Sequence, residues 1–261
     1  MITREVLCAF SLTAVAAVLF STTGCGADDS HAGHTPTATQ RATSPKPPPT
    51  TTLAAPTVTV PAVGEVPGNA NAAAALQPWV RDLVAGDTDE LVRKCWTIEP
   101  QHAREMYADK NGILAAIGEP GIDGQFAVSW QGPVRTVSVK RGEIASGYAC
   151  PYVRPTGSRT GFTEADARYA VYRYLSRWVG RPVDSSDVEG AYPLVCAGSV
   201  LAGNPGRLTG TTAFGESTSR VVGRDDVEVS VPVTNSSGVT GPLVFATAIG
   251  PEGYCINDIS G

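Results

Sequence analysis

Histidine is scarce in this 261-residue sequence: there are three, and only His102 lies beyond residue 34. A zinc site needs several Cys or His ligands that converge, and the cysteines here are far apart rather than in Cys-x-x-Cys pairs. The Gly-x-Ser-x-Gly turn of a nucleophile elbow and the Gly-Lys-Ser/Thr end of a phosphate-binding loop are also missing. We therefore expect no metal site, no cofactor and no catalytic residue.

Concentrated positive charge is missing as well. The chain has 25 acidic and 20 basic residues, a net charge of -5, and no basic patch. We expect no nucleic-acid partner, because proteins that bind nucleic acid gather Lys and Arg on one surface. After the first 20 residues, no apolar run approaches the roughly 20 residues that a membrane-spanning helix needs.

An uncharged apolar stretch does occur near the N-terminus, at residues 6–20, and the small residues 21–24 then lead to Cys25. A run of this length with a small-residue exit is typical of a secretory signal. Ser-Thr-Thr-Gly-Cys resembles a bacterial lipobox, which implies a signal peptide over residues 1–24 and acyl chains, palmitate among them, on Cys25. An ordinary secretory signal, or an apolar anchor with an incidental cysteine, is the alternative.

Residues 25–68 are predicted to be the lipidated cysteine followed by a disordered tether. The segment is rich in Thr and Ala, has no aromatic residue, and contains eight prolines: Pro36, Pro45, Pro47, Pro48, Pro49, Pro56, Pro61 and Pro67. Such a composition buries too little apolar surface to offset chain entropy. His31 and His34 are interpreted as part of this solvated linker rather than as metal ligands. The membrane is then a partner through the lipid, and the protein lies on the extracytoplasmic side of the cell membrane.

The remaining cysteines suggest two disulfide-linked modules. Cys8 is lost with the signal, which leaves an even number in an exported chain: Cys95, Cys150, Cys196 and Cys255. Four cysteines permit three pairings. The intervals 95–150 and 196–255 are nearly equal, and both closing cysteines follow a Gly-Tyr context, so we favour Cys95–Cys150 and Cys196–Cys255. The regularity predicts modules over 69–157 and 158–261; coincidence within one domain is the alternative.

In each module the sequence predicts helices followed by strands, which places the chain in the α+β class. Leu76, Trp79, Val80 and Leu83 have helical spacing, and Pro78 is placed in the first turn of that helix. Thr163 begins the clearest helix, over 163–179, which Gly180 and Pro182 end. Strands are expected at 125–130, 134–140, 143–153, 194–200, 208–214, 227–234, 243–249 and 254–259.

The phrase from Trp79 to Leu91, a helix, a Gly-Asp corner and a second helix, resembles the opening of NTF2-like domains. Exported actinobacterial lipoproteins carry such domains, and the resemblance covers residues 75–153 and, by the order of the elements, residues 163–259. The resemblance implies helices packed on a curved antiparallel sheet, as two tandem NTF2-like modules after the tether. The fold often encloses a pocket. Because it occurs in isomerases, dehydratases and ligand binders, the fold alone does not indicate which function this chain has.

Two observations bear on function. Tyr169, Tyr172, Tyr174 and Trp178 crowd one helix, so Tyr169 and Tyr172 are candidates for a binding face, with amphipathic packing as the alternative. His102 lies in a polar helix and is interpreted as a solvated side chain rather than a catalytic base, so His102→Ala is expected to leave fold and function nearly intact. We therefore expect a non-catalytic module that binds an envelope protein or apolar ligand. The alternative is a pocket enzyme, an isomerase or hydrolase acting on an envelope lipid or small apolar compound.

Overall fold

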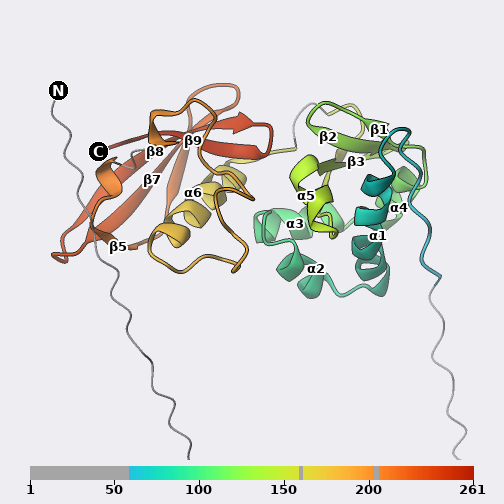
Figure 1. Ribbon diagram of the computed structural model, residues 1–261, viewed down its shortest axis with the longest axis horizontal. Coiled ribbons are helices and arrows are strands. Elements are labelled where there is room, and N and C mark those ends of the chain that lie inside the picture. The colour runs from blue at the N-terminus through green and yellow to red at the C-terminus, as the bar shows by residue number, and fades with distance from the viewer. Residues whose placement is uncertain (1–58, 159–160, 203–205) are drawn as a thin grey trace, which may run out of the picture. The chain divides into compact units, whose positions relative to one another are not determined.

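The computed structural model describes residues 59–158, 161–202 and 206–261 (Figure 1). The predicted signal peptide, Cys25 and residues 26–58 lie outside the described residues. The described chain is α+β, with two separate antiparallel sheets. We call residues 59–158 the first lobe and residues 161–261 the second lobe; both belong to one compact unit. A search of the described ranges finds no helix long and apolar enough to cross a membrane.

The first lobe packs helices against a four-stranded sheet of order β1-β2-β3-β4 (Figure 1). Its helices are α1 (Ala70–Ala85), α2 (Thr88–Lys94), α3 (Pro100–Tyr107), α4 (Lys110–Ile117) and α5 (Arg141–Ser146). Its strands are β1 (Ile122–Asp123), β2 (Ala127–Gln131), β3 (Arg135–Lys140) and β4 (Tyr152–Pro155). Three helices begin at a carboxylate that accepts a backbone N–H three residues along: Asp87, Glu99 and Asp109. These acceptors satisfy N–H groups that the first helical turn leaves unpaired.

The second lobe packs one long helix, α6 (Glu164–Trp178), against a five-stranded sheet. Its strands are β5 (Thr211–Phe214), β6 (Thr218–Val221), β7 (Asp226–Asn235), β8 (Thr240–Gly250) and β9 (Gly253–Ser260). Strand β7 pairs with β8 on one side and with both β5 and β6 on the other. A capping box starts α6, because Thr163 and Asp166 each accept the other's backbone N–H. Inward residues of β7 alternate, with Val227, Val229 and Val231 buried under α6.

Each lobe has its own apolar core and its own disulfide. The first core centres on Trp79 and Trp130, and the second on Leu175 and Phe245. Disulfides join Cys95 to Cys150 and Cys196 to Cys255, the pairing that the two intervals favour. Two disulfides are consistent with an oxidising, extracytoplasmic environment.

The predicted end of the tether is wrong for residues 59–68. Val63 and Val66 are buried in the first core. The Trp130 indole donates to the carbonyl of Gly64 at 2.9 Å, and the Gln77 amide donates to Pro61 at 2.9 Å. Two buried valines and two hydrogen bonds hold this segment on the first lobe, so residues 59–68 belong to the folded part rather than to the tether.

Three expected elements also differ. Helix α1 starts eight residues before Pro78, because the preceding alanines favour a helix and Ala72 and Ala75 pack in the core. The expected strand 143–153 contains α5 and then β4; Gly147, at a φ of 78°, ends α5 in the left-handed conformation that glycine tolerates. In the stretch 194–200, Val195 forms an isolated bridge to Ile256 and Val200 begins a 3-10 helix, and strand β6 was not expected.

Candidate functional site

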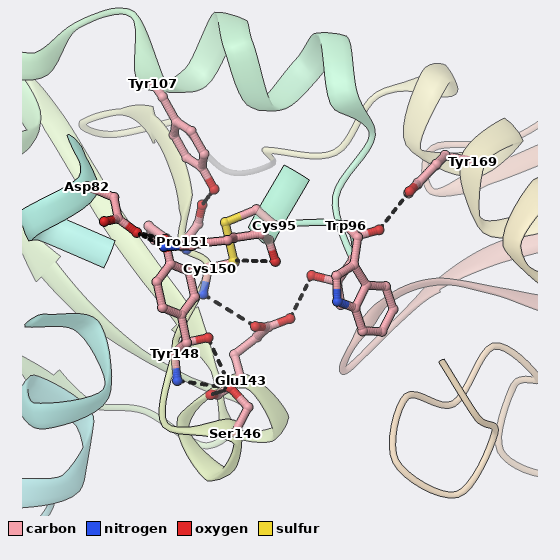
Figure 2. The surroundings of a disulfide bond; sticks show 12 residues. Asp82, Cys95, Trp96, Tyr107, Glu143, Ser146, Tyr148, Cys150, Pro151 and Tyr169 are labelled. Carbon is pink, nitrogen blue, oxygen red and sulfur yellow. Dashed lines mark hydrogen bonds and ion pairs between the residues drawn. A yellow bond between two sulfur atoms is a disulfide. The ribbon is translucent and has the colours of Figure 1, made fainter. Parts of the chain in front are cut away.

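Tyr169 and Tyr172 lie three residues apart on α6 and therefore on the same face of that helix. Their rings stack with centroids 6.0 Å apart at an interplanar angle of 16°. The Tyr169 hydroxyl donates to the carbonyl of Trp96 at 2.7 Å, a contact from the second lobe to the first (Figure 2). Burial raises the pKa of Tyr169 above its usual value, so the hydroxyl stays protonated and remains a donor. Tyr172 is 48% exposed and meets the Phe214 ring edge-on at 5.7 Å.

These aromatic residues line an open groove of about 540 Å³, which we call the tyrosine groove. Its floor and walls come from α6, the turn after β5 and the residue before α3, and include Tyr169, Tyr172, Phe214, Arg168, Glu216 and Glu99. The volume lies within the range of small-molecule sites, which are typically apolar with a few polar groups. The structure thus brings both tyrosines of the expected binding face into one concave surface.

The interpretation of His102 as a solvated side chain is wrong. Its side chain is only 12% exposed, and Nδ1 lies 2.8 Å from Oδ2 of Asp166, whose side chain is 4% exposed. Among the ion pairs between described residues, this is the only one that joins the two lobes. The polar helix around His102 suggested solvent, but its neighbour in space comes from α6, 64 residues along the chain.

The carboxylate of Asp166 both caps α6 and pairs with His102. Asp166 Oδ2 accepts the Thr163 N–H at 2.7 Å and the Thr163 hydroxyl at 2.9 Å, in addition to the contact with His102. Burial disfavours the charged imidazole of His102, but the hydrogen bond and charge of Asp166, aided by Glu99 and Glu105, outweigh it and raise its pKa. The start of α6, and with it the tyrosine groove, is thus tied electrostatically to α3.

A narrow, partly open cavity with room for about 30 Å³ lies beside this pair, lined by charged and phenolic groups that include Lys140, Glu143, Tyr152, Asp166, Arg173 and Glu252. A space of this size holds a water molecule but no substrate. Glu143 accepts from the Thr97 hydroxyl at 2.7 Å and from the Cys150 N–H at 3.3 Å, next to the first disulfide (Figure 2). Burial raises the pKa of Glu252, against the charge of Lys140. The cavity therefore has acid–base groups without room for a compound to act on.

Arg173 and Arg177, in the second half of α6, share one buried carboxylate, that of Asp187. Arg173 Nη2 lies 2.6 Å from Oδ1 of the fully buried Asp187, and Arg177 also pairs with Asp187. The Arg173 guanidinium also lies 5.0 Å from the centre of the Trp96 ring. The contacts with Asp187 hold the loop after α6 in place. The contact with the Trp96 ring positions the residue whose carbonyl accepts from the Tyr169 hydroxyl. The sequence around Asp187 does not indicate its role, because the arginines that pair with it lie 14 and 10 residues earlier, in α6.

Comparison with protein-family models, with curated proteins and with solved structures finds no match to this chain. In the ranges that the structure describes, no group of three or more His, Cys, Asp or Glu side chains could hold a metal ion. The tyrosine groove and the junction between the lobes are therefore the candidate functional features of the described residues.

Proposed function

We propose that this protein is a lipid-anchored lipoprotein of the cell envelope whose folded part is a non-catalytic binding module. The lipobox-like cysteine and the proline-rich tether support the anchor, and the two disulfides support export. We further propose that each lobe is an NTF2-like module; helices that precede an antiparallel sheet in both lobes support this.

The observation that carries the binding function is the tyrosine groove. Tyr172 is half exposed, and its ring stacks on Tyr169 and meets Phe214 edge-on, so it joins the three rings into one wall. Rigid aromatic rings bury much apolar area at a small entropic cost, which makes them effective contact residues. The charged cavity beside His102 and Asp166 has room for only about 30 Å³, so the larger tyrosine groove is the better binding site. The ligand it suits is a small uncharged molecule with a flat apolar face.

Tyr172→Ala is expected to weaken binding of Nile red, an uncharged aromatic probe, about tenfold, because the stacked wall of the groove is lost. Binding is measured by probe fluorescence on the full mature chain. Trp178→Ala is the matched control, since Trp178 is an exposed aromatic residue on the same helix that does not line the groove. Equal loss in both variants, or no loss in Tyr172→Ala, would refute the groove as the site.

Cys25→Ser is expected to shift the protein from the membrane fraction to the soluble fraction or to stall its processing. Two or more acyl chains hold a protein firmly, and each buried methylene contributes about 0.8 kcal/mol. Fractionation with intact mass measurement tests this. An unmodified N-terminus at another residue in the wild-type protein would contradict the anchor while leaving the groove untouched.

A further inference from the structure

Lys140, the last residue of β3, reaches from the first lobe to the second. Its Nζ donates to the carbonyl of Glu252 at 2.6 Å, in the turn between β8 and β9. The turn approaches closely because Gly253 adopts a φ of 105°, and a Cβ there would lie 3.4 Å from Nζ and 3.3 Å from the Phe162 ring. Lys140 is thus held at a defined position at the junction of the lobes.

The ammonium group is short of oxygen acceptors. It can donate three hydrogen bonds, and within the described ranges it makes one, to Glu252, and no ion pair. Its other neighbours are ring faces, with Nζ 4.8 Å from the centre of Tyr152 and 5.8 Å from that of Phe162. Burial lowers the pKa of Lys140, and the charges of Glu143 and Glu252 oppose this only in part. By contrast, Lys94 pairs with Asp82 at 2.7 Å.

Lys140 also lines a second pocket, of about 370 Å³, which lies apart from the tyrosine groove and which we call the lysine pocket. Arg154 lines it too, and its guanidinium donates to the carbonyl of Ser158 rather than to a carboxylate. The lining contains one acidic residue, Asp225, against these two cations. The remaining walls are largely apolar or aromatic and include Tyr152, Phe162, Ile249 and Pro251.

We propose that the lysine pocket binds a small amphipathic anion, a carboxylate on an apolar body. The carboxylate accepts from the Lys140 ammonium and the Arg154 guanidinium, which gives both cations an ionised acceptor in addition to their backbone carbonyls. The apolar body lies against Ile249, Pro251 and the aromatic rings. The size of the pocket, at the low end of small-molecule sites, restricts the body to a short chain or a single ring system. This site is separate from the tyrosine groove and does not depend on it.

The first test uses the wild-type mature chain, with octanoate as the probe. The sequence has four lysines, Lys46, Lys94, Lys110 and Lys140, so acylation of each by an amine-reactive ester can be followed by peptide mass spectrometry. Octanoate is expected to slow labelling of Lys140 at least fivefold and to leave Lys94 and Lys110 unchanged. Acetate lacks the apolar body and octanol lacks the negative charge, so both are expected to slow the labelling of Lys140 only slightly. Equal protection by acetate or by octanol, or no protection by octanoate, would overturn the proposal.

The second test measures octanoate affinity by calorimetry. Lys140→Met keeps the length of the side chain and removes its charge, and is expected to weaken binding at least tenfold. Lys110→Met is the matched control, because Lys110 is also half-buried and donates to a single backbone carbonyl, that of Val84 at 2.8 Å, but does not line the pocket. Unchanged affinity in Lys140→Met, or an equal loss in Lys110→Met, would refute the assignment. Nile red binding stays unchanged in Lys140→Met if the two sites are distinct.

Discussion

Asp166→Ala is expected to lower the free energy of unfolding by about 2–3 kcal/mol, because the substitution removes the charge-assisted hydrogen bond to His102 and leaves that buried ring without a partner. The variant also loses the cap of α6, whose removal typically costs about 1 kcal/mol within that total. Chemical denaturation of the mature chain, followed by tryptophan fluorescence, measures the change.

Asp166→Asn separates the two contributions, since an amide oxygen can still accept from Thr163 but carries no charge. A loss in Asp166→Asn close to that in Asp166→Ala would assign most of the effect to the pair with His102. Asp184→Ala is the control, because the Asp184 side chain accepts solvent-exposed hydrogen bonds from Ser186 within its own turn and, among the described residues, forms no ion pair. A loss no larger in Asp166→Ala than in Asp184→Ala would contradict the role of the pair.

The pair also predicts how stability depends on pH. The pKa of His102 is higher in the folded state than in the unfolded chain, where it is about 6.5. The folded state therefore binds this proton more tightly, and the contribution is complete below about pH 6.5 and is lost as the pH rises through the folded-state pKa. In His102→Gln, the part of the slope above pH 6.5 should vanish. An identical pH profile in the variant and the wild type would rule out this linkage.

Loss of either disulfide is the second large effect. Replacing Cys196 and Cys255 together by serine is expected to cost about 2–5 kcal/mol, since the bond closes a long loop and limits the unfolded ensemble. The same cost is expected for Cys95 and Cys150. Denaturation of the two double variants, with and without a reducing agent, measures it.

The reducing agent provides the internal control. It should destabilise the wild type and should have no effect on a chain in which all four cysteines are replaced. Peptide mapping of the unreduced wild type should show the same two bonds. A bond between Cys150 and Cys196 in solution, or free thiols in the exported protein, would contradict the pairing.

The sequence by itself determined the class of structure and much of the covalent framework. Helix caps and apolar spacing are local signals, so α6 was predicted within a residue at each end from Thr163 and the residues before Gly180. The strands of the second sheet at 227–234, 243–249 and 254–259 were also close, since their apolar and polar residues alternate. The disulfide pairing followed from the nearly equal intervals between cysteines.

Local signals failed where a partner came from elsewhere in the chain. Val63 and Val66 pack on a core that the proline-rich composition around them does not indicate. Glu143 accepts from Thr97 and from Cys150, and α5 forms where alternation suggested a strand.

For the tyrosine groove, too, the sequence indicated some of the residues and the tertiary structure placed the others beside them. Crowding of tyrosines on one helix was visible in the sequence, and it pointed to Tyr169 and Tyr172. Only the tertiary structure brought Phe214 beside them, paired His102 with Asp166, and set Lys140 among aromatic rings against Glu252. The physical reason is that burial and charge pairing depend on distances across the two lobes, whereas helices, turns and caps depend on residues within one or two turns of each other.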